Sequence, residues 1–248
     1  MWPWEKERCV ICNKSVYYNL RCESKIVRKM SNSDDDDLQL CPTTLAALNE
    51  FLKEKEEREN ELKCISENQS LDICFDENWQ LSQFWYDEYT TDTLVKGAIN
   101  STDSTGKIAL ISCPTLYNKL KKNCGLRQAN SLLTVTLFEY DERFKIFGSD
   151  YVPYNYKFPL DLTRNMAGYY DLVIADPPFL SDECLTKTAL TIKFLAKKNI
   201  VLCTGAVMAE LAGKLMDVKI CNFIPHHQNN LGNEFYCYSN FDFDKMLK

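Results

Sequence analysis

The sequence predicts an α/β fold in which a mostly parallel, doubly wound sheet is covered by helices on both faces. From residue 106 onward, short apolar runs alternate with segments whose apolar residues have helical spacing, and this alternation is typical of βαβ units. The apolar runs contain few polar positions, as expected of strands that are buried on both faces. Two runs near the C-terminus, 218–223 and 235–241, are joined by a polar loop and predict a closing antiparallel pair.

The main domain is expected to run from residue 77 to residue 248. Its predicted strands are 107–112, 132–140, 151–156, 171–175, 200–203, 218–223 and 235–241. Its predicted helices are 90–99, 116–124, 142–148, 181–196 and 206–215, with 160–166 as a turn or short helix. Thr90 or Thr91 can cap the first of these helices, and Ser181 can cap the fourth, with Glu183 in its first turn.

The first 76 residues differ from the rest in charge and in periodicity. Residues 1–30 have a net charge of +4, residues 31–78 have −10, and residues 79–248 are neutral. We expect a flexible extension over 1–42, basic and then acidic, followed by a helix and a connector over 43–76. Cys9 and Cys12 form a C-x₂-C pair without a second pair of ligands, so a flexible segment is favoured over a zinc site and no metal is expected.

Composition narrows the class of protein further. The chain has 248 residues, of which 45% are hydrophobic and 26% charged, and this suits a soluble domain with a substantial core. No apolar run approaches about 18 residues, the length that spans a bilayer, and the first residues lack the apolar region of a secretory signal. Most of the twelve cysteines stand singly, as reduced core thiols do. We expect a cytoplasmic protein, monomeric and not bound to a membrane.

Residues 171–179 carry the most informative motif. The strand predicted from Leu172 to Ala175 is followed by Asp176-Pro177-Pro178-Phe179. The two prolines donate no N–H and end the strand. An acid, free carbonyls and an aromatic ring therefore lie at the C-terminal edge of the sheet, where open α/β sheets bind ligands. The four residues resemble the [DN]PP[FYW] signature of amino-group methyltransferases that use S-adenosylmethionine.

Two other strands are expected to place functional residues at the same edge. Ser112 and Cys113 follow the first strand, and Glu139 and Asp141 follow the second. An acid after the second strand is what a nucleotide-binding sheet uses to accept ribose hydroxyls. The first strand is not followed by a G-x-G loop, which argues against a dinucleotide because a pyrophosphate needs close backbone approach. S-adenosylmethionine has no phosphates and does not impose this need.

The chain resembles the N6-adenine-methyltransferase-like family, in the group of eukaryotic lysine methyltransferases that act on translation elongation factor 1-alpha. The resemblance covers about residues 40–241 and is carried by the stretches 77–86, 138–144, 171–180, 202–206 and 233–235. It implies a Rossmann-like, seven-strand class I methyltransferase sheet with an N-terminal helical extension. It also implies S-adenosylmethionine as cofactor and a protein lysine as acceptor. Residues 1–29 have no counterpart in the family, and 125–133 is longer than usual.

The same resemblance implies roles for individual residues. Glu139 and Asp141 would hold the ribose of the cofactor, and Ser112 and Cys113 would lie near its methionine end. The pocket would be roofed by Phe84, Trp85 and Tyr86.

A mechanism follows from the acceptor chemistry. A lysine amine must lose its charge before it can attack a methyl group, and a dry pocket favours the neutral form. The Asp176 carboxylate and the Pro177 carbonyl can accept hydrogen bonds from the amine, Pro178 ends the strand, and Phe179 can pack against the lysine stem. The two histidines, His226 and His227, stand in a polar loop and are expected to be solvated.

Two alternatives remain open at this stage. The same motif serves enzymes that methylate the N6 amine of adenine in DNA or RNA. The neutral charge of residues 79–248 and the acidic segment before them argue against nucleic acid. A non-catalytic binding module with the same fold is the other alternative, and an altered Asp-Pro-Pro-Phe motif would have favoured it.

Overall fold

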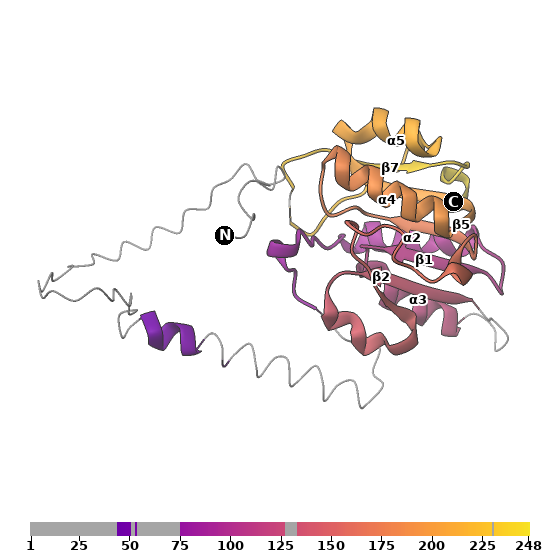
Figure 1. Cartoon of the computed structure of the whole chain (residues 1–248). Helices are drawn as coiled ribbons and strands as arrows, with labels where there is room; N and C mark the ends of the chain where they lie inside the picture. The colour runs from indigo at the N-terminus through magenta and orange to yellow at the C-terminus, as the bar shows by residue number, and fades with distance from the viewer. Residues whose placement is uncertain (1–43, 51–52, 54–74, 127–132, 230) are drawn as a thin grey trace, which may run out of the picture. The chain divides into compact units, whose positions relative to one another are not determined.

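A computed structural model of the chain (Figure 1) describes residues 44–50, 53, 75–126, 133–229 and 231–248. The chain forms two compact units, and everything described from residue 75 onward belongs to the larger one. In the smaller unit, residues 44–50 are helical and exposed, within the segment 43–76 for which a helix and a connector were predicted. The predicted extension over 1–42, with Cys9 and Cys12, lies outside the described residues.

The larger unit is built on a seven-stranded sheet of order β3-β2-β1-β4-β5-β7-β6. The strands are β1 Lys107–Ile111, β2 Thr134–Glu139, β3 Tyr151–Pro153, β4 Tyr170–Ala175, β5 Ala196–Gly205, β6 Lys219–Ile220 and β7 Phe235–Ser239. The pairs among β1 to β5 are parallel, and β7 is antiparallel to both β5 and β6. The doubly wound sheet and its antiparallel closing pair are therefore confirmed.

Five strands, β1, β2, β3, β6 and β7, are shorter than predicted, and β6 differs most. Strand β6 has two residues, Lys219–Ile220, whereas the prediction was 218–223. The backbone N–H of Asn222 donates to the Asp244 carboxylate at 2.9 Å, so the chain leaves the ladder there. Strand β6 lies at the edge of the sheet and pairs with only Tyr238 and Ser239 of the neighbouring strand β7.

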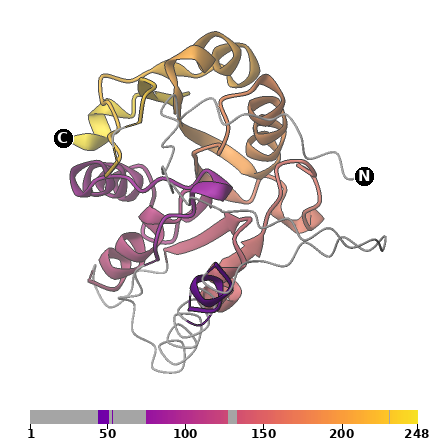
Figure 2. The ribbon, with the colours of Figure 1, turned by 90° about the vertical axis from the view of Figure 1, so that its left-hand side faces the viewer.

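Helices cover both faces of the sheet (Figures 1 and 2). The α-helices are α2 Glu88–Asn100, α3 Thr115–Leu126, α4 Asp182–Leu195 and α5 Ala209–Met216. The short 3-10 helices are η1 Trp79–Leu81, η2 Glu142–Asp150, η3 Arg164–Met166, η4 Ala206–Met208 and η5 Asp244–Leu247. Helices α2 and α3 pack together, as do α4 and α5. No helix in the described part of the chain is long and apolar enough to cross a membrane.

The predicted helix starts were right for α4 and wrong for α2. Ser181 caps α4, with its hydroxyl accepting from the N–H of Cys184 at 3.2 Å. Helix α2 begins at Glu88 and is capped by Asp87, whose carboxylate accepts from the N–H of Thr90 at 2.7 Å. Thr90 and Thr91 are buried inside the helix instead of capping it. Helix α5 begins at Ala209, three residues later than predicted, because η4 precedes it.

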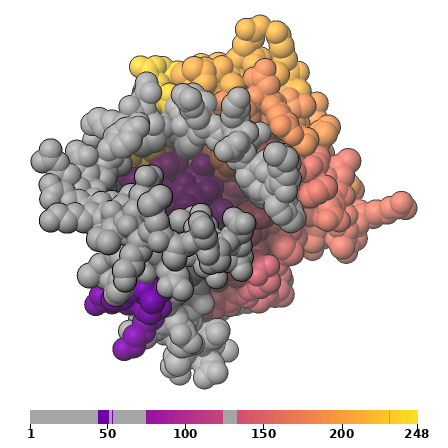
Figure 3. All heavy atoms as spheres, turned by 60° about the vertical axis from the view of Figure 1, so that its left-hand side comes forward, coloured from indigo at the N-terminus to yellow at the C-terminus, as the bar shows by residue number. Residues whose placement is uncertain are grey.

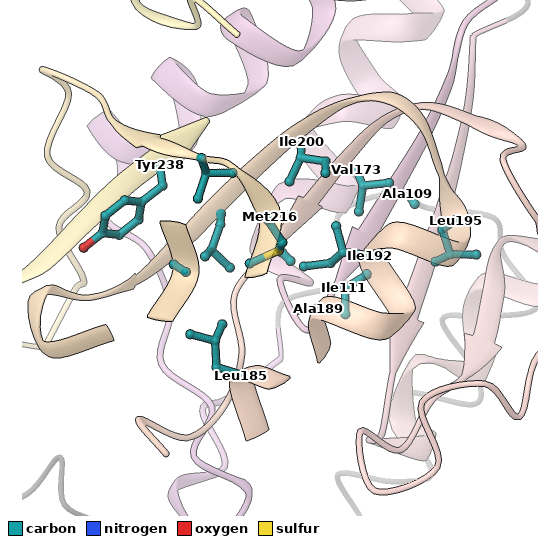
Figure 4. Packing of buried hydrophobic residues seen from close by; sticks show 14 of the residues in the cluster. Ala109, Ile111, Val173, Leu185, Ala189, Ile192, Leu195, Ile200, Met216 and Tyr238 are labelled. Atoms are coloured by element: carbon teal, nitrogen blue, oxygen red, sulfur yellow. The ribbon is translucent and has the colours of Figure 1, made fainter. Parts of the chain in front are cut away.

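The core on one face lies between the sheet and helices α4 and α5 (Figure 4). Alternate strand residues such as Ala109, Ile111 and Val173 meet Leu185 and Ile192 from α4. The intervening residues of β1, including Ile108 and Leu110, are also fully buried, on the face where α2 and α3 pack. Burial on both faces gives β1 and β4 the nearly continuous apolar sequences that made them recognisable.

Candidate active site

A cavity of about 790 Å³ opens at the C-terminal ends of the parallel strands, within the usual size range of small-molecule sites. Its walls come from the loops that follow β1, β2, β3 and β4, from residues 79–86, and from three residues near β7: His227, Leu231 and Phe235. In the space-filling view, purple atoms from the beginning of the larger unit are visible on the same face of the molecule as salmon and orange parts of the chain (Figure 3). The cavity thus lies at the C-terminal edge of the sheet, where the sequence predicted a ligand site.

The Asp176–Phe179 segment forms part of the cavity wall, next to the end of β4. The backbone N–H of Asp176 still donates to the carbonyl of Ile111 at 3.0 Å, and the two prolines then end the pairing. The Tyr86 hydroxyl donates to Oδ2 of Asp176 at 2.6 Å. Burial raises the pKa of Asp176 to about 7, while the Tyr86 hydrogen bond acts in the opposite direction.

Glu139, the last residue of β2, presents a second buried carboxylate to the cavity. Its Oε1 accepts from the backbone N–H groups of Tyr140 at 2.9 Å and Asp141 at 3.3 Å. Burial raises the pKa of Glu139 to about 7, although these N–H groups favour the charged form. The carboxylate is thus held by the backbone in a fixed orientation.

Asp141 has a different position, although it too is buried. It caps η2, accepts from Nε2 of Gln83 at 3.1 Å and pairs with Arg143 at 2.7 Å. It is not among the residues that line the cavity. Of the two acids predicted to hold a ribose, only Glu139 therefore faces the cavity. Asp141 instead binds the side chain of Gln83, the residue just before the predicted roof segment 84–86.

The turn after β1 brings Ser112 and Cys113 into the cavity wall without a glycine. Ser112 has φ +54°, in the left-handed region that glycine usually occupies, and its N–H donates to the carbonyl of Phe138 at 2.9 Å. Cys113 is buried, and burial raises the pKa of its thiol well above the ordinary value. This side chain therefore contributes a neutral thiol, not a thiolate.

The three residues predicted to roof the pocket, Phe84, Trp85 and Tyr86, all line the cavity. The segment is anchored by Glu77, which accepts from the backbone N–H of Trp85 at 2.7 Å. The Trp85 indole donates to the carbonyl of Phe75 at 2.8 Å. Phe75 packs on Phe144, so the larger unit already includes a residue two positions before the predicted boundary at 77.

The loop before β7 lies against the roof, and sequence reasoning missed this pairing. Gln228 N–H donates to the Trp85 carbonyl at 2.8 Å, and Asp87 N–H donates to the His226 carbonyl at 3.0 Å. Between them, His227 forms a β-bridge with Tyr86. The expectation that both histidines are solvated is right for His226 and wrong for His227, which is half-buried and lines the cavity. Neither motif nor periodicity linked these two segments, since more than 130 residues separate them.

The residues present fit S-adenosylmethionine. Its ribose offers two hydroxyl donors, which the buried Glu139 carboxylate can accept. Its adenine needs apolar or aromatic walls, and Tyr140, Tyr154 and Tyr156 are lining residues near Glu139 along the chain. It carries no phosphate, which agrees with a turn at Ser112 that lacks glycine. Among the described residues, no group of His, Cys, Asp and Glu side chains is arranged to hold a metal ion.

The strand order and the cavity at the strand ends define a Rossmann-like class I methyltransferase fold. Residues 77–243 match the family model described as "Probable N6-adenine methyltransferase". EEF1A lysine methyltransferase 1 from Mus musculus is 47% identical over 215 residues, covering 86% of this chain and 97% of that protein. The Homo sapiens protein of the same name is 44% identical over 216 residues, with coverage of 86% and 97%. This chain therefore belongs to the family of the EEF1A lysine methyltransferase 1 proteins, and the match to the family model agrees with this.

More distant relatives extend the comparison. Protein-lysine N-methyltransferase EFM5 from Saccharomyces cerevisiae is 34% identical over 231 residues, covering 82% of this chain and 92% of that protein. Among solved structures, a SAM-dependent methyltransferase from Aquifex aeolicus matches 73% of this chain and 97% of its own, at 10% identity and a TM-score of 0.38.

Proposed function

We propose that this protein transfers a methyl group from S-adenosylmethionine to a lysine side chain of translation elongation factor 1-alpha. The observation that carries the proposal is the Asp176-Pro177-Pro178-Phe179 segment in the wall of a cavity that also contains the buried Glu139. The names of the curated relatives, at 44–47% identity, support a lysine of elongation factor 1-alpha as acceptor. Cytoplasmic location and a monomeric state stay predictions.

Glu139 and the walls around it would hold the cofactor. Its carboxylate would accept hydrogen bonds from the ribose hydroxyls, and Ser112 and Cys113 would lie near the methionine end. When bound, S-adenosylmethionine supplies a methyl group that is activated by the positive charge on its sulfur. The roof residues 84–86 line the same cavity as Asp176. With the cofactor bound they would help to exclude water, and this would strengthen electrostatic interactions there.

Asp176 and its neighbours would receive the acceptor. A lysine ammonium ordinarily has a pKa near 10.4, and burial in this cavity lowers that pKa. The Asp176 carboxylate and the Pro177 carbonyl accept the N–H groups and aim the lone pair of the amine, and Phe179 packs against the lysine stem. With a pKa of about 7, the Asp176 carboxylate can also take the proton that the amine releases.

No observation favours adenine as the acceptor over lysine. The family model carries the adenine name, but residues 79–248 lack the basic excess that phosphate binding requires. A non-catalytic module is also not favoured, because the motif is intact and lines a cavity that fits the cofactor.

The test is the substitution Asp176→Ala in the full chain. We expect methylation of elongation factor 1-alpha, followed by mass spectrometry, to fall to background. S-adenosylmethionine binding, measured by calorimetry, should be largely retained because Glu139 is unchanged.

The matched control is Asp182→Ala, which removes an exposed acid in the first turn of α4 that does not line the cavity. This variant should methylate at the wild-type rate. An active Asp176→Ala enzyme would overturn the assignment of Asp176.

A further inference from the structure

The hydroxyl of Tyr86 is bound directly to the proposed catalytic carboxylate. It donates to Oδ2 of Asp176 at 2.6 Å, across 90 residues of sequence. Tyr86 is 2% exposed and lines the cavity. Burial and the nearby Asp176 carboxylate both raise the pKa of Tyr86 well above its ordinary value, so the hydroxyl remains a proton donor.

This bond leaves Asp176 with one engaged oxygen and one open oxygen. Among the described residues, no second hydrogen-bond donor to the Asp176 side chain is present. A carboxylate oxygen at the cavity wall with no protein donor is available to a ligand N–H. The rotation of the carboxylate is set by Tyr86, because a short charge-assisted bond is both strong and directional.

The ring of Tyr86 is itself held by residues that lie in and just before β7. Its centroid lies 5.0 Å from that of His227, which in turn lies 4.9 Å from the ring of Phe235. The backbone β-bridge between Tyr86 and His227 joins the two segments at the same point. Since burial lowers the pKa of His227 to about 4, this imidazole stays neutral and adds no charge beside Asp176.

We propose that Tyr86 is a positioning residue for methyl transfer: it holds Oδ2 of Asp176 so that Oδ1 faces the acceptor amine, and His227 and Phe235 hold its ring. The proposal rests on the function proposed for Asp176 above. Tyr86 acts through Asp176 and is not itself required to touch the acceptor. This role differs from that of a roof over the cofactor.

The titratable groups that face Asp176 and Tyr86 from the neighbouring elements are Glu139, Cys113, Cys203 and His227. Glu139 at the end of β2 acts on Asp176 with its negative charge and disfavours a second one. Cys113 after β1 and Cys203 in β5 lie near Tyr86, and His227 packs on its ring. None of these groups supplies a positive charge. Among the described residues, it is therefore the Tyr86 hydroxyl that stabilises the charged form of Asp176.

The test is Tyr86→Phe, which removes one oxygen and keeps the ring. Loss of the hydrogen bond raises the pKa of Asp176, so a larger fraction of the carboxyl is protonated at neutral pH. The acid limb of the pH profile of kcat should therefore move to higher pH by about one unit, which is the effect expected from the loss of one charge-assisted hydrogen bond. At pH 7, where the ionised fraction of Asp176 would fall from about one half to about one tenth, we expect kcat to fall about fivefold and the KM for the cofactor to change little.

Tyr117→Phe is the matched control. Tyr117 is also buried and its hydroxyl also donates to a carboxylate, Oδ2 of Asp150, at 2.8 Å. Neither residue lines the cavity. The acid limb of this variant should coincide with that of the wild type.

Two results would overturn the proposal. One is a folded Tyr86→Phe enzyme, shown by thermal unfolding and cofactor calorimetry, with an unshifted acid limb and unchanged kcat. If Tyr86→Phe does not fold, His227→Ala decides: loss of ring support should shift the limb in the same direction, and an unshifted limb contradicts the proposal. Failure of the wild-type enzyme to methylate elongation factor 1-alpha would instead refute the proposed function itself, so the two failures are distinguishable.

Discussion

Two carboxylates in one cavity, Glu139 and Asp176, have pKa values raised to about 7. Burial is the main cause for both, each lies beside another acid, and no cation among the described residues contributes to either pKa. Residues with such pKa values gather at functional sites because catalysis and ligand binding use both protonation states. At the residue scale, the carboxyl groups of Glu139 and Asp176 therefore change their charge near neutral pH.

Cofactor binding should depend on pH through Glu139. As pH falls through about 7, Glu139 takes up a proton and loses an acceptor for the ribose hydroxyls, so affinity for S-adenosylmethionine should fall. In Glu139→Gln, affinity at pH 8 should be about tenfold lower, because a hydrogen bond to a charged group is lost. The change in affinity for S-adenosylmethionine that comes from the titration of Glu139 should also be absent in this variant. Calorimetry at pH 6 and pH 8 measures both effects.

Glu142→Gln provides the comparison for this experiment. Glu142 is exposed, pairs with Lys145 at 2.9 Å and does not line the cavity. Its substitution should leave affinity and pH dependence as in the wild type. An equal affinity of Glu139→Gln and wild type at pH 8 would show that Glu139 does not hold the cofactor.

At the scale of elements, the C-terminal helix η5 completes the core beside α2. Phe243, at its N-terminal end, is 1% exposed, and the side chain of Asn100 in α2 donates to the carbonyl of Met246 at 2.8 Å. Gly97 lets the two elements approach closely. The last residues of the chain are therefore part of the support for α2, which directly follows the roof segment.

Gly97→Ala should destabilise the protein even though alanine favours helices. The new Cβ would lie 2.5 Å from Cζ of Phe243 and 2.6 Å from Cδ2 of Leu247. Overpacking costs about 1–3 kcal/mol, which exceeds the gain of about 1 kcal/mol in helix propensity. We expect a net loss of about 1 kcal/mol in the free energy of unfolding, measured with urea.

Gly213→Ala in α5 is the matched control. There the nearest atom to a new Cβ is the carbonyl oxygen of Val218 at 3.7 Å, an ordinary contact. This variant should gain up to about 1 kcal/mol. Similar effects of the two substitutions would contradict the close packing of η5 on α2.

At the scale of the whole molecule, charge distribution separates a protein acceptor from nucleic acid. Residues 79–248, which contain nearly all of the cavity-forming elements, carry equal numbers of basic and acidic residues. A nucleic-acid enzyme would ordinarily present a basic face to the phosphates. The net charge of −6 for the chain points in the same direction.

Methyl-labelled cofactor added to a cell extract should therefore label protein. Treatment of the extract with nucleases should leave the labelled product unchanged, while protease should remove it. Label that disappears with nuclease would support adenine as the acceptor. The Asp176→Ala enzyme serves as the blank, because it should transfer no label to either class of molecule.

The features predictable from sequence were those with a local cause. Asp176-Pro177-Pro178-Phe179 ends β4 because proline cannot donate to a ladder, and the structure places it in the cavity wall. The apolar runs of β1 and β4 were recognisable because burial on both faces requires them. Glu139 could be located because an acid after the second strand faces the ligand edge in such folds.

Other features depend on contacts between distant parts of the chain. Which of Glu139 and Asp141 faces the cavity depends on Gln83 and Arg143, which engage Asp141. The burial of His227 depends on the roof strand that pairs with it. Tyr86 reaches Asp176 across 90 residues. Periodicity and end signals report only neighbours in sequence, whereas these contacts arise from the order of the strands and the packing of loops at their ends, and that order brings Tyr86, Asp176 and His227 into one cavity.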